Sequence, residues 1–441
     1  MISNKAKKIL AAAFAAVISL AAFTACQTQT PEVASTPSTE AKASSQAAPE
    51  QPKETVTLNF WHHYSAQSAE NETLTKVLIP KFEEENPGYK VNAVSHEWAD
   101  LHDKILVSAS SKTLPDVART DIAWIPEFQK MGILVALDKE MSDFNDVSGA
   151  LLESAMSTAK VKGNYYAIAL NTNTKILFYN KKALEDAKIS APKTMAEFVD
   201  AAKKLSGKNA KGQQVWGYTE PALAGWNICP FIWSYGGAIT DDTCTKATGY
   251  LNNDKTIAAV KMLADLYKNG AINGFNSGDI PMTDGFGTGR YMMLLEGPWK
   301  VAELKGAYPD FAYETMEMPA GDGGSHSVLG GEDIAMFNTA NKEGAWKFMK
   351  FMTSEFAQTE MAKCGQIPIS KKALESDTVK NAAFAPYLKA IETAKARPAV
   401  ASWSEIDTEL TNAVTSIIKD GADAKTTMDA LAVKVDALLA Q

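Results

Sequence analysis

Several residue types are scarce in this sequence. Among 441 residues there are four cysteines, five histidines and three arginines. Four cysteines form too few disulfide bonds to stabilise a chain of this length, so a scaffold built on disulfides is excluded. Acidic residues outnumber basic ones by 52 to 44, and the net charge of -8 provides no positive field for nucleic acid. Nucleic acid is therefore not expected as a partner.

What remains is the composition of an ordinary globular protein. Hydrophobic residues make up 46% of the chain and charged residues 22%, close to the average for soluble domains. At roughly 150 residues per domain, the length predicts two or three domains, each large enough to bury its own core.

The first 25 residues predict a targeting segment. Three lysines precede an apolar run over residues 9–23, which is typical of an export signal. The run has about 15 residues, whereas a transmembrane helix needs about 20. Residues 23–26, Phe-Thr-Ala-Cys, resemble the lipobox of bacterial lipoproteins. That resemblance implies cleavage before Cys26, a lipid on its sulfur and a place at the outer face of the bacterial cytoplasmic membrane. The alternative is a plain secretory signal cleaved after Ala25.

Residues 26–54 predict a flexible tether that follows the lipidated cysteine. The segment is rich in Ser, Thr, Ala, Gln, Glu and Pro and contains no aromatic residue. It cannot bury enough apolar area to offset the entropy of ordering it. Such a tether suits a protein that stays at a membrane and reaches a partner on it.

The order of the next segments predicts an α/β fold. Strand-like and helix-like patterns alternate along the chain. The expected elements are a strand at 56–61, a helix at 74–82, a strand at 90–95, a helix at 101–110 and a strand near 115–119. This order is typical of a largely parallel sheet, in which ligands gather at the carboxyl ends of the strands.

Later segments continue the same alternation. They predict a strand at 175–180, helices at 194–206 and 251–269, a strand at 291–295, a helix at 344–364 and a helical tail at 403–439. Export would permit a disulfide between Cys229 and Cys244, and Cys364 would remain as a buried thiol.

Nine short motifs follow one another between residues 59 and 368. They are NFWHHY at 59–64, FEEENP at 82–87, LPDV at 114–117, LFYNKK at 177–182, PKT at 192–194, EGPW at 296–299, LGG at 329–331, AWKF at 345–348 and IP at 367–368. In this order they resemble the extracytoplasmic solute-binding proteins of ABC importers, in the family that takes up sugars and glycerol phosphates and includes maltose-binding proteins.

The resemblance implies the two-lobed periplasmic-binding-protein fold, with two α/β lobes joined by a hinge of crossing segments. The first lobe is expected at 55–168 and 320–354, and the second at 169–319 and 355–441. A sugar or oligosaccharide would bind in the cleft, and lobe closure would deliver it to the membrane permease. We expect a monomer that is not an enzyme and needs neither cofactor nor metal.

The resemblance also implies which side chains line the cleft. A sugar site needs flat aromatic platforms and polar groups held in place. The candidates are His62, His63, Tyr64, Asp121, Trp124, Tyr179, Glu220, Trp226, Trp299, Gly330, Gly331, Glu332 and Trp403. Trp299 is the leading stacking platform, and Asp333 is an alternative to Glu332 for binding hydroxyls. Ala222 stands where maltodextrin binders carry an aromatic residue, and Trp226 is expected to replace it.

Other functions stay open at this point. The scarcity of arginine favours a neutral sugar, while the match of 171–180 to phosphodiester-binding relatives keeps a glycerol phosphodiester open. A lipid-anchored sugar receptor or adhesin is a further alternative. A glycosidase, which needs only two carboxylates, is the least favoured. Residues 96–100 begin like a zinc-protease helix, but Asp100 stands where the second histidine is required, so the zinc site cannot form.

Overall fold

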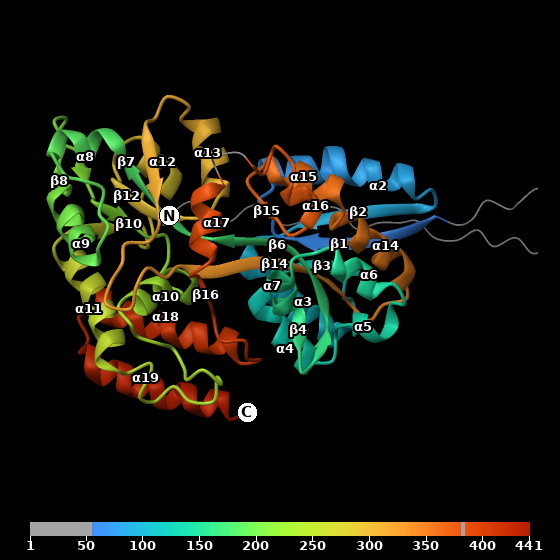
Figure 1. The fold of residues 1–441 in the computed structure, drawn as a ribbon. Helices are drawn as coiled ribbons and strands as arrows, with labels where there is room; N and C mark the ends of the chain where they lie inside the picture. Colours follow the sequence, from blue (N-terminus) through green and yellow to red (C-terminus); the bar gives the residue numbers. More distant parts are fainter. Residues whose placement is uncertain (1–54, 381–383) are drawn as a thin grey trace, which may run out of the picture. The chain divides into compact units, whose positions relative to one another are not determined.

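The structure, a computed structural model, describes residues 55–380 and 384–441 (Figure 1). The predicted signal segment, Cys26 and the tether lie outside the described residues. Among the helices of the described part, none is long and apolar enough to cross a membrane.

Two β-sheets organise the described chain. The first has the strand order β15-β6-β14-β3-β1-β2, with β16 beside β14, and the second has the order β11-β10-β12-β7-β13. The strands of the first sheet are β1 (Val56–His62), β2 (Tyr89–Ser95), β3 (Val117–Asp121), β6 (Ala167–Thr174), β14 (Val328–Met336), β15 (Ile367–Pro368) and β16 (Lys395–Ala396). Those of the second are β7 (Ile176–Asn180), β10 (Tyr218–Thr219), β11 (Ile272–Asn273), β12 (Met293–Glu296) and β13 (Tyr313–Met316). Two small hairpins pair β4 (Lys160–Val161) with β5 (Asn164–Tyr165) and β8 (Gly207–Lys208) with β9 (Gln214–Val215).

The directions of the strands set one common edge in the first sheet. β1 is parallel to β2 and β3, and β14 is antiparallel to both β3 and β6. The carboxyl ends of β1, β2, β3 and β6 therefore meet at the same edge. Only one residue separates β6 from β7 of the second sheet, so this edge faces the second sheet.

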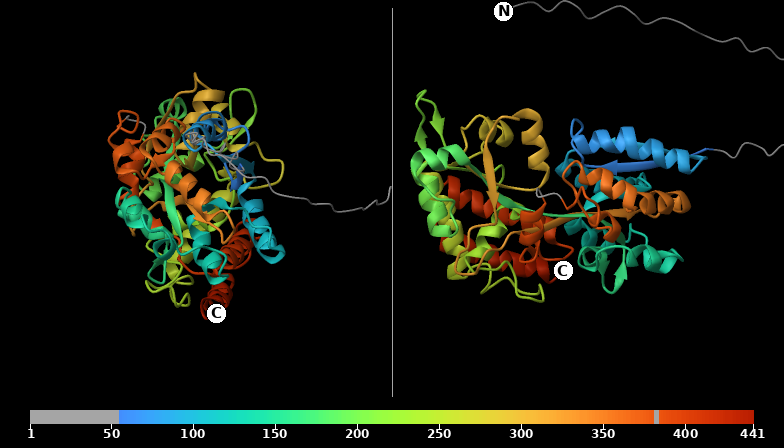
Figure 2. Two further views of the ribbon diagram at one scale, coloured as in Figure 1. Left: turned by 90° about the vertical axis from the view of Figure 1, so that its right-hand side faces the viewer. Right: turned by 45° about the horizontal axis from the view of Figure 1, so that its top comes forward.

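Helices cover both faces of the first sheet, and we call this assembly the first lobe. One layer comprises α1 (Ala69–Thr73), the π-helical turn η1 (Leu74–Leu78), α2 (Ile79–Glu85), α14 (Lys342–Met352) and α15 (Glu355–Ala362). In the right-hand view of Figure 2 the blue and orange helices of this layer lie together, and the Phe82 and Phe348 rings touch at 5.1 Å. Around the rest of the sheet lie α3 (Trp98–Ser111), η2 (Ile122–Trp124), α4 (Ile125–Lys130), α5 (Leu137–Glu140), α6 (Phe144–Gly149), α7 (Glu153–Met156), η3 (Ser157–Ala159) and α16 (Lys371–Leu374).

The second sheet is buried between helices in the same way, forming the second lobe. Successive residues of β7 point to opposite faces, and Leu177 and Phe178 accordingly join different apolar cores. The helices of this lobe are α8 (Lys181–Ala187), α9 (Met195–Lys204), α10 (Gly225–Ser234), α11 (Asp254–Lys268), α12 (Met282–Gly287), α13 (Trp299–Ala307), α17 (Ala385–Ile391), α18 (Trp403–Lys419) and α19 (Ala424–Leu439). The helices on both faces of each sheet confirm the predicted α/β class. The sheets combine parallel and antiparallel pairs, whereas a largely parallel sheet was expected.

Two of the predicted helices are interrupted. The helix expected at 344–364 divides because Ser354 accepts a hydrogen bond from the Ala357 amide and so begins α15. After this break Phe356 is 42% exposed, although a continuous helix over 344–364 would place it on the same face as the buried Phe348 and Met352. The tail divides at Gly421, whose φ of 72° suits glycine.

The lobe limits differ from those expected. β6 stays in the first sheet as far as Thr174 because its ladder with β14 continues to Leu329. Residues after 354 were expected in the second lobe, yet β15 pairs with β6 and Met361 packs in the core around β1. The chain therefore returns to the first lobe before it ends in the second.

No disulfide joins the cysteines of the described residues. Cys229, Cys244 and Cys364 are all free thiols. Cys229 is fully buried inside α10, and burial raises the pKa of its thiol.

The start of α9 is fixed by a reciprocal cap. The Glu197 amide donates to the Thr194 hydroxyl at 3.2 Å, and the Thr194 amide donates to the Glu197 carboxylate at 3.0 Å. We expect Thr194→Ala to lower the free energy of unfolding by about 1 kcal/mol, measured by chemical denaturation. Thr408→Ala, at an exposed position of α18, is the control and should cost nothing, because alanine is the better helix former. An equal loss in both variants would contradict the capping role.

Candidate ligand-binding site

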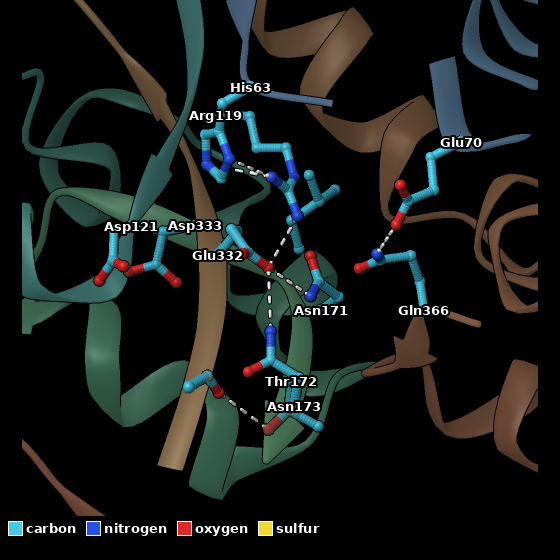
Figure 3. A network of polar contacts seen from close by, with 12 residues as sticks. His63, Glu70, Arg119, Asp121, Asn171, Thr172, Asn173, Glu332, Asp333 and Gln366 are labelled. Carbon is cyan, nitrogen blue, oxygen red and sulfur yellow. Dashed lines mark hydrogen bonds and ion pairs between the residues drawn. The ribbon is translucent and has the colours of Figure 1, made fainter. Parts of the chain in front are cut away.

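The candidate site begins with a buried ion pair between adjacent strands of the first lobe. Arg119 of β3 lies 2.8 Å from the carboxylate of Glu332 on β14 (Figure 3). Asn171 and Asn173, from the end of β6, donate their amide N–H groups to the same carboxylate. These side chains come from three neighbouring strands and converge because the strands run side by side.

His63 completes the surroundings of Arg119. Its Nδ1 lies 2.9 Å from the Arg119 guanidinium, and Arg119 also lies over the Tyr64 ring at 4.2 Å. Burial and the charge of Arg119 hold the pKa of His63 well below its usual value, and the same two causes lower that of His62 to about 3. Both imidazoles are therefore neutral, and His63 can accept from the guanidinium.

A second buried pair lies where the chain passes from one lobe to the other. Lys175, between β6 and β7, contacts the Glu220 carboxylate at 3.1 Å, and both are almost fully buried. Tyr218 and Asn227 donate to the same carboxylate. Glu220 thus has its partners within the protein.

A third pair brings Trp226 into the site. Arg397 donates to Asp121, the last residue of β3, at 2.7 Å. The Trp226 ring lies 5.5 Å from the Arg397 guanidinium and 5.8 Å from the Lys175 ammonium. Trp226, from α10 of the second lobe, therefore lies beside cations contributed by the crossing segments.

The glycines of β14 have a packing role. A side chain at Gly330 would begin 2.2 Å from the side-chain oxygen Oδ1 of Asn173 and 2.5 Å from the Trp226 ring. Gly331 has a φ of 147°, and a side chain there would meet the backbone of Asn171. Glycine at both positions lets β6 and Trp226 approach β14 closely.

Several polar atoms of this site have no partner in the described chain. They are the amide oxygens of Asn171 and Asn173 and the Nε groups of Arg119 and Arg397. All four residues are at least nine-tenths buried. Burying an unpaired polar group is costly, so these two acceptors and two donors indicate a place for a polar ligand.

Glu70 lies at the border of the site. Figure 3 shows its carboxylate directed toward Gln366, which donates to it. Burial raises the pKa of Glu70.

Three of the predicted residues have most of their contacts outside this cluster. Trp124 is 3% exposed and packs on His102 in a core of the first lobe, and its ring lies 6.0 Å from that of His63 at the edge of the cluster. Trp403 is 2% exposed and packs against Gly225. Tyr179 donates to Glu314 on the second sheet.

Trp299, expected as the main platform, is partly buried at the start of α13. Its indole folds over Gly297, and its backbone lies next to Gly365 of the first lobe. It borders the contact between the lobes and does not share a contact with Trp226, Arg119 or Glu332 among those described. Asp333, the alternative to Glu332, is fully buried with Thr158, and burial raises its pKa to about 8.

Sequence reasoning did not single out five residues of the site, namely Arg119, Asn171, Asn173, Lys175 and Arg397. A signal was present in two cases, because two of only three arginines lie in segments that are otherwise buried. A buried arginine requires a carboxylate partner, and the partner becomes evident only once the strands are aligned.

The family comparison agrees with this geometry. The model of the bacterial extracellular solute-binding proteins matches residues 78–386, and the chain belongs to that family. Membership implies an exported protein, and the resemblance deduced from the motifs is confirmed.

Individual relatives point the same way. A putative binding protein of Brucella abortus strain 2308 is 27% identical over 378 residues, covering 81% of this chain and 88% of the relative. The maltotriose-binding protein of Pyrococcus abyssi is 26% identical over 298 residues, covering 66% of this chain and 62% of the relative. The solved GacH receptor of Streptomyces glaucescens, determined unliganded and with acarbose, superposes with a TM-score of 0.79 at 21% identity, covering 88% of this chain and 99% of that one. The two-lobed fold is thus confirmed.

A contact between helices of the two lobes contains a titratable group. Glu127 of α4 lies 2.9 Å from the His102 Nε2 of α3 and 2.8 Å from the Ser404 hydroxyl of α18. Burial lowers the pKa of His102, but hydrogen bonding to Glu127 and its charge outweigh this, and the net shift is upward. Asp103, 3.5 Å from the other ring nitrogen, acts in the same direction.

This contact should depend on pH. Because the folded-state pKa of His102 is raised, its stabilising effect is fully present below the usual pKa of 6.5 and is lost as the pH rises through the raised value. We expect His102→Asn to lower the free energy of unfolding more on the acidic side of this range than on the alkaline side, measured by denaturation at a series of pH values. His96→Asn is the control with the opposite slope, since burial lowers the pKa of His96. A cost of His102→Asn that does not vary with pH would refute the assignment.

Proposed function

We propose that this protein is the substrate-binding lipoprotein of an ABC importer and that it captures a neutral sugar or oligosaccharide between its lobes. Closure of the lobes would then present the loaded protein to the membrane permease. In this proposal the protein acts as a monomer, without a cofactor and without catalysis. The similarity to a maltotriose-binding protein and to a receptor solved with acarbose supports a sugar as the ligand.

One observation carries the choice of a neutral ligand. Each buried cation of the site already has a carboxylate within salt-bridge distance: Glu332 for Arg119, Asp121 for Arg397 and Glu220 for Lys175. An anionic ligand would have to displace one of these carboxylates or be buried beside it. Hydroxyl groups both donate and accept, so they can satisfy the unpartnered amide oxygens and Nε groups without added charge.

The ligand-binding residues we assign combine some of those expected with three that sequence reasoning did not single out. They are His63, Trp226, Arg119, Asn171, Asn173 and Glu332, with Asp121 and Glu220 holding the neighbouring cations. Trp226 supplies an aromatic platform beside Asn173, because its ring lies 2.5 Å from the Cβ position of Gly330, which is also next to the Asn173 side chain. Trp299 would join from the border of the cleft when the lobes close.

We also assign the lobes from the sheets. The first lobe takes residues 55–174, 328–374 and the short strand 395–396, and the second takes 176–316, 384–394 and 397–441. Residue 175 and the segment 317–327 are then hinge crossings.

A glycerol phosphodiester is the second candidate ligand. The unpartnered Nε groups of two arginines favour it, because guanidinium groups bind phosphate well. Each of these arginines is already paired with a carboxylate, so a glycerol phosphodiester is less favoured than a neutral sugar.

A thermal-shift screen tests the proposed ligand class. Any ligand that prefers the folded state raises the melting temperature by mass action. We expect shifts with neutral mono- or oligosaccharides and none with glycerol phosphodiesters. Shifts with phosphodiesters alone would overturn the neutral-sugar assignment, and product release from a glycan would overturn the binding-protein assignment.

Trp226→Ala should weaken binding of the sugar found in that screen about ten- to a hundredfold. The reason is the loss of the aromatic platform beside Asn173. Isothermal titration measures the change, and Trp98→Ala, which alters a tryptophan 42% exposed on α3, is the control and should bind normally. Unchanged affinity in Trp226→Ala would remove it from the site, and the same comparison with Trp299→Ala decides whether that residue joins on closure.

The proposed anchor is tested by Cys26→Ser. Without the thiol no lipid can be attached, so we expect the protein to move from the membrane fraction to the soluble fraction. Fractionation followed by immunoblotting measures the distribution. Continued membrane association would contradict lipidation at Cys26.

A further inference from the structure

The outer end of the second lobe carries a cluster of exposed cations. Between residues 201 and 219 the chain has four lysines and no acidic residue, although acidic residues outnumber basic ones in the whole sequence. These exposed residues are Lys203 and Lys204 in the last turn of α9, Lys208 in β8 and Lys211 in the turn between β8 and β9. Figure 1 shows α9 and β8 at the end of the second lobe that lies away from the first sheet.

Arg290 adds a fifth cation from another segment. Its Nε donates to the Gln214 carbonyl oxygen of β9 at 2.5 Å, and its guanidinium lies 5.5 Å from the Trp216 ring. Trp216 is only partly buried, so an aromatic ring accompanies the cations at this surface. We call this set the hairpin patch; it comprises Lys203, Lys204, Lys208, Lys211, Arg290 and Trp216.

The cations of the hairpin patch have no counter-charge in the described chain. None of the five forms an ion pair with a described residue, whereas Lys181 and Lys182 of α8, in the same lobe, pair with Glu314 and Asp186. Asp200 lies one turn before the end of α9 and forms no ion pair with them either. The charge of the patch is therefore available to a partner.

Helix stability accounts for only two of these lysines. Lys203 and Lys204 stabilise α9 because cations favour the negative end of the helix dipole. Lys208 and Lys211 lie beyond the helix, and no residue of the segment 208–213 is buried. Neither helix capping nor core packing explains why two further lysines stand there.

The hairpin is nevertheless held in one conformation. The Asn209 Oδ1 accepts hydrogen bonds from the amides of Lys211 and Gln213, each at 3.0 Å. At the base of the hairpin the Gly217 amide donates to the Ser206 hydroxyl at 2.8 Å. Because a two-stranded hairpin by itself is only marginally stable, these bonds are needed to fix the backbone that carries the lysines.

We propose that the hairpin patch binds the anionic phospholipid surface of the membrane. Exposed cations that lie close together act jointly on anionic headgroups. A partly exposed tryptophan suits the boundary between headgroups and acyl chains, since one end of its ring system is apolar and the other polar. The choice of a membrane over a soluble anion rests on one part of the proposed function, the lipid anchor at Cys26, which would keep such a surface within reach.

The two attachments would act at opposite ends of the folded part. The described chain enters the first lobe through β1, whose carboxyl end faces the second lobe, so β1 begins on the side away from that lobe. The hairpin patch lies at the outer end of the second lobe (Figure 1). An anchor ahead of β1 and the hairpin patch together would hold both lobes alongside the membrane.

The test uses the processed chain from residue 26 with Cys26→Ser, so that neither the leader nor a lipid contributes. Both described lobes lie within this chain. In about 0.1 M salt, charges act over about 10 Å, so the acidic remainder of the protein is screened from the patch. We expect cosedimentation with vesicles of phosphatidylcholine and phosphatidylglycerol and none with phosphatidylcholine alone. Equal binding to both kinds of vesicle would overturn a charge-based contact.

A fourfold variant locates the contact. Lys203→Gln, Lys204→Gln, Lys208→Gln and Lys211→Gln together should lower the partition coefficient at least about tenfold. All four side chains are exposed, so the variant should fold normally. Undiminished vesicle binding by this variant would refute the proposal.

A matched control removes the same charge from the first lobe. It changes four exposed lysines without an ion pair in the described chain to glutamine, namely Lys112, Lys130, Lys160 and Lys162. This variant should bind vesicles as the parent does. An equal loss in both fourfold variants would mean that net charge acts without the hairpin patch, which contradicts the proposal.

Two further measurements separate the membrane from other partners and from the sugar. Binding of soluble polyphosphate without binding of vesicles would assign the patch to an anionic polymer and overturn the membrane assignment. Sugar affinity should be the same in the parent and the hairpin variant. Sugar binding without vesicle binding rejects this inference alone, and vesicle binding without sugar binding supports it and rejects only the proposed ligand.

Discussion

The ion pair between Arg119 and Glu332 determines the arrangement of the candidate site. A guanidinium and a carboxylate that are both buried are costly unless they are paired and their remaining hydrogen bonds are made. The side chains around them meet this demand: Asn171 and Asn173 donate to the carboxylate, and His63 lies against the guanidinium. Because β3, β14 and β6 are neighbours in one sheet, the pair also fixes which polar atoms are left over for a ligand.

The same principle extends to the segments that join the lobes. Lys175 and Arg397 belong to crossing segments, and each is neutralised by a carboxylate from a different part of the chain. The site therefore combines strong local fields with little net charge. Such a site can orient dipoles such as hydroxyl groups, and it discriminates against a ligand that brings an uncompensated charge.

Much of the fold could be predicted from the sequence because periodicity is a local property. The strands near 56–61, 90–95 and 115–119 and the helices at 194–206 and 251–269 all occur close to their expected positions. The break before α15 was missed although Ser354 gave a local signal for a helix start. The return of residues 355–370 to the first lobe had no local signal, since strand pairing between β15 and β6 is a long-range property.

The candidate site was predictable to a lesser extent. His63, Asp121, Glu220, Trp226, Gly330 and Glu332 were expected from the family motifs, and the structure brings them into one connected region. Motifs cannot separate a tryptophan that stacks on a ligand from one that packs in a core, and Trp403 illustrates this with its contact to Gly225. Polar residues inside buried strands, such as Asn171 and Asn173, interrupt the apolar pattern of the strand. Their role becomes evident only when the neighbouring strand is known.

Strand β14 sets how closely the two lobes can approach each other. A Cβ at Gly330 would lie 2.2 Å from the side-chain oxygen of Asn173 in the first lobe and 2.5 Å from the Trp226 ring of the second lobe. Any larger residue at this position would therefore hold the two lobes apart. The approach of the lobes thus depends on a residue that contributes no side chain to the site.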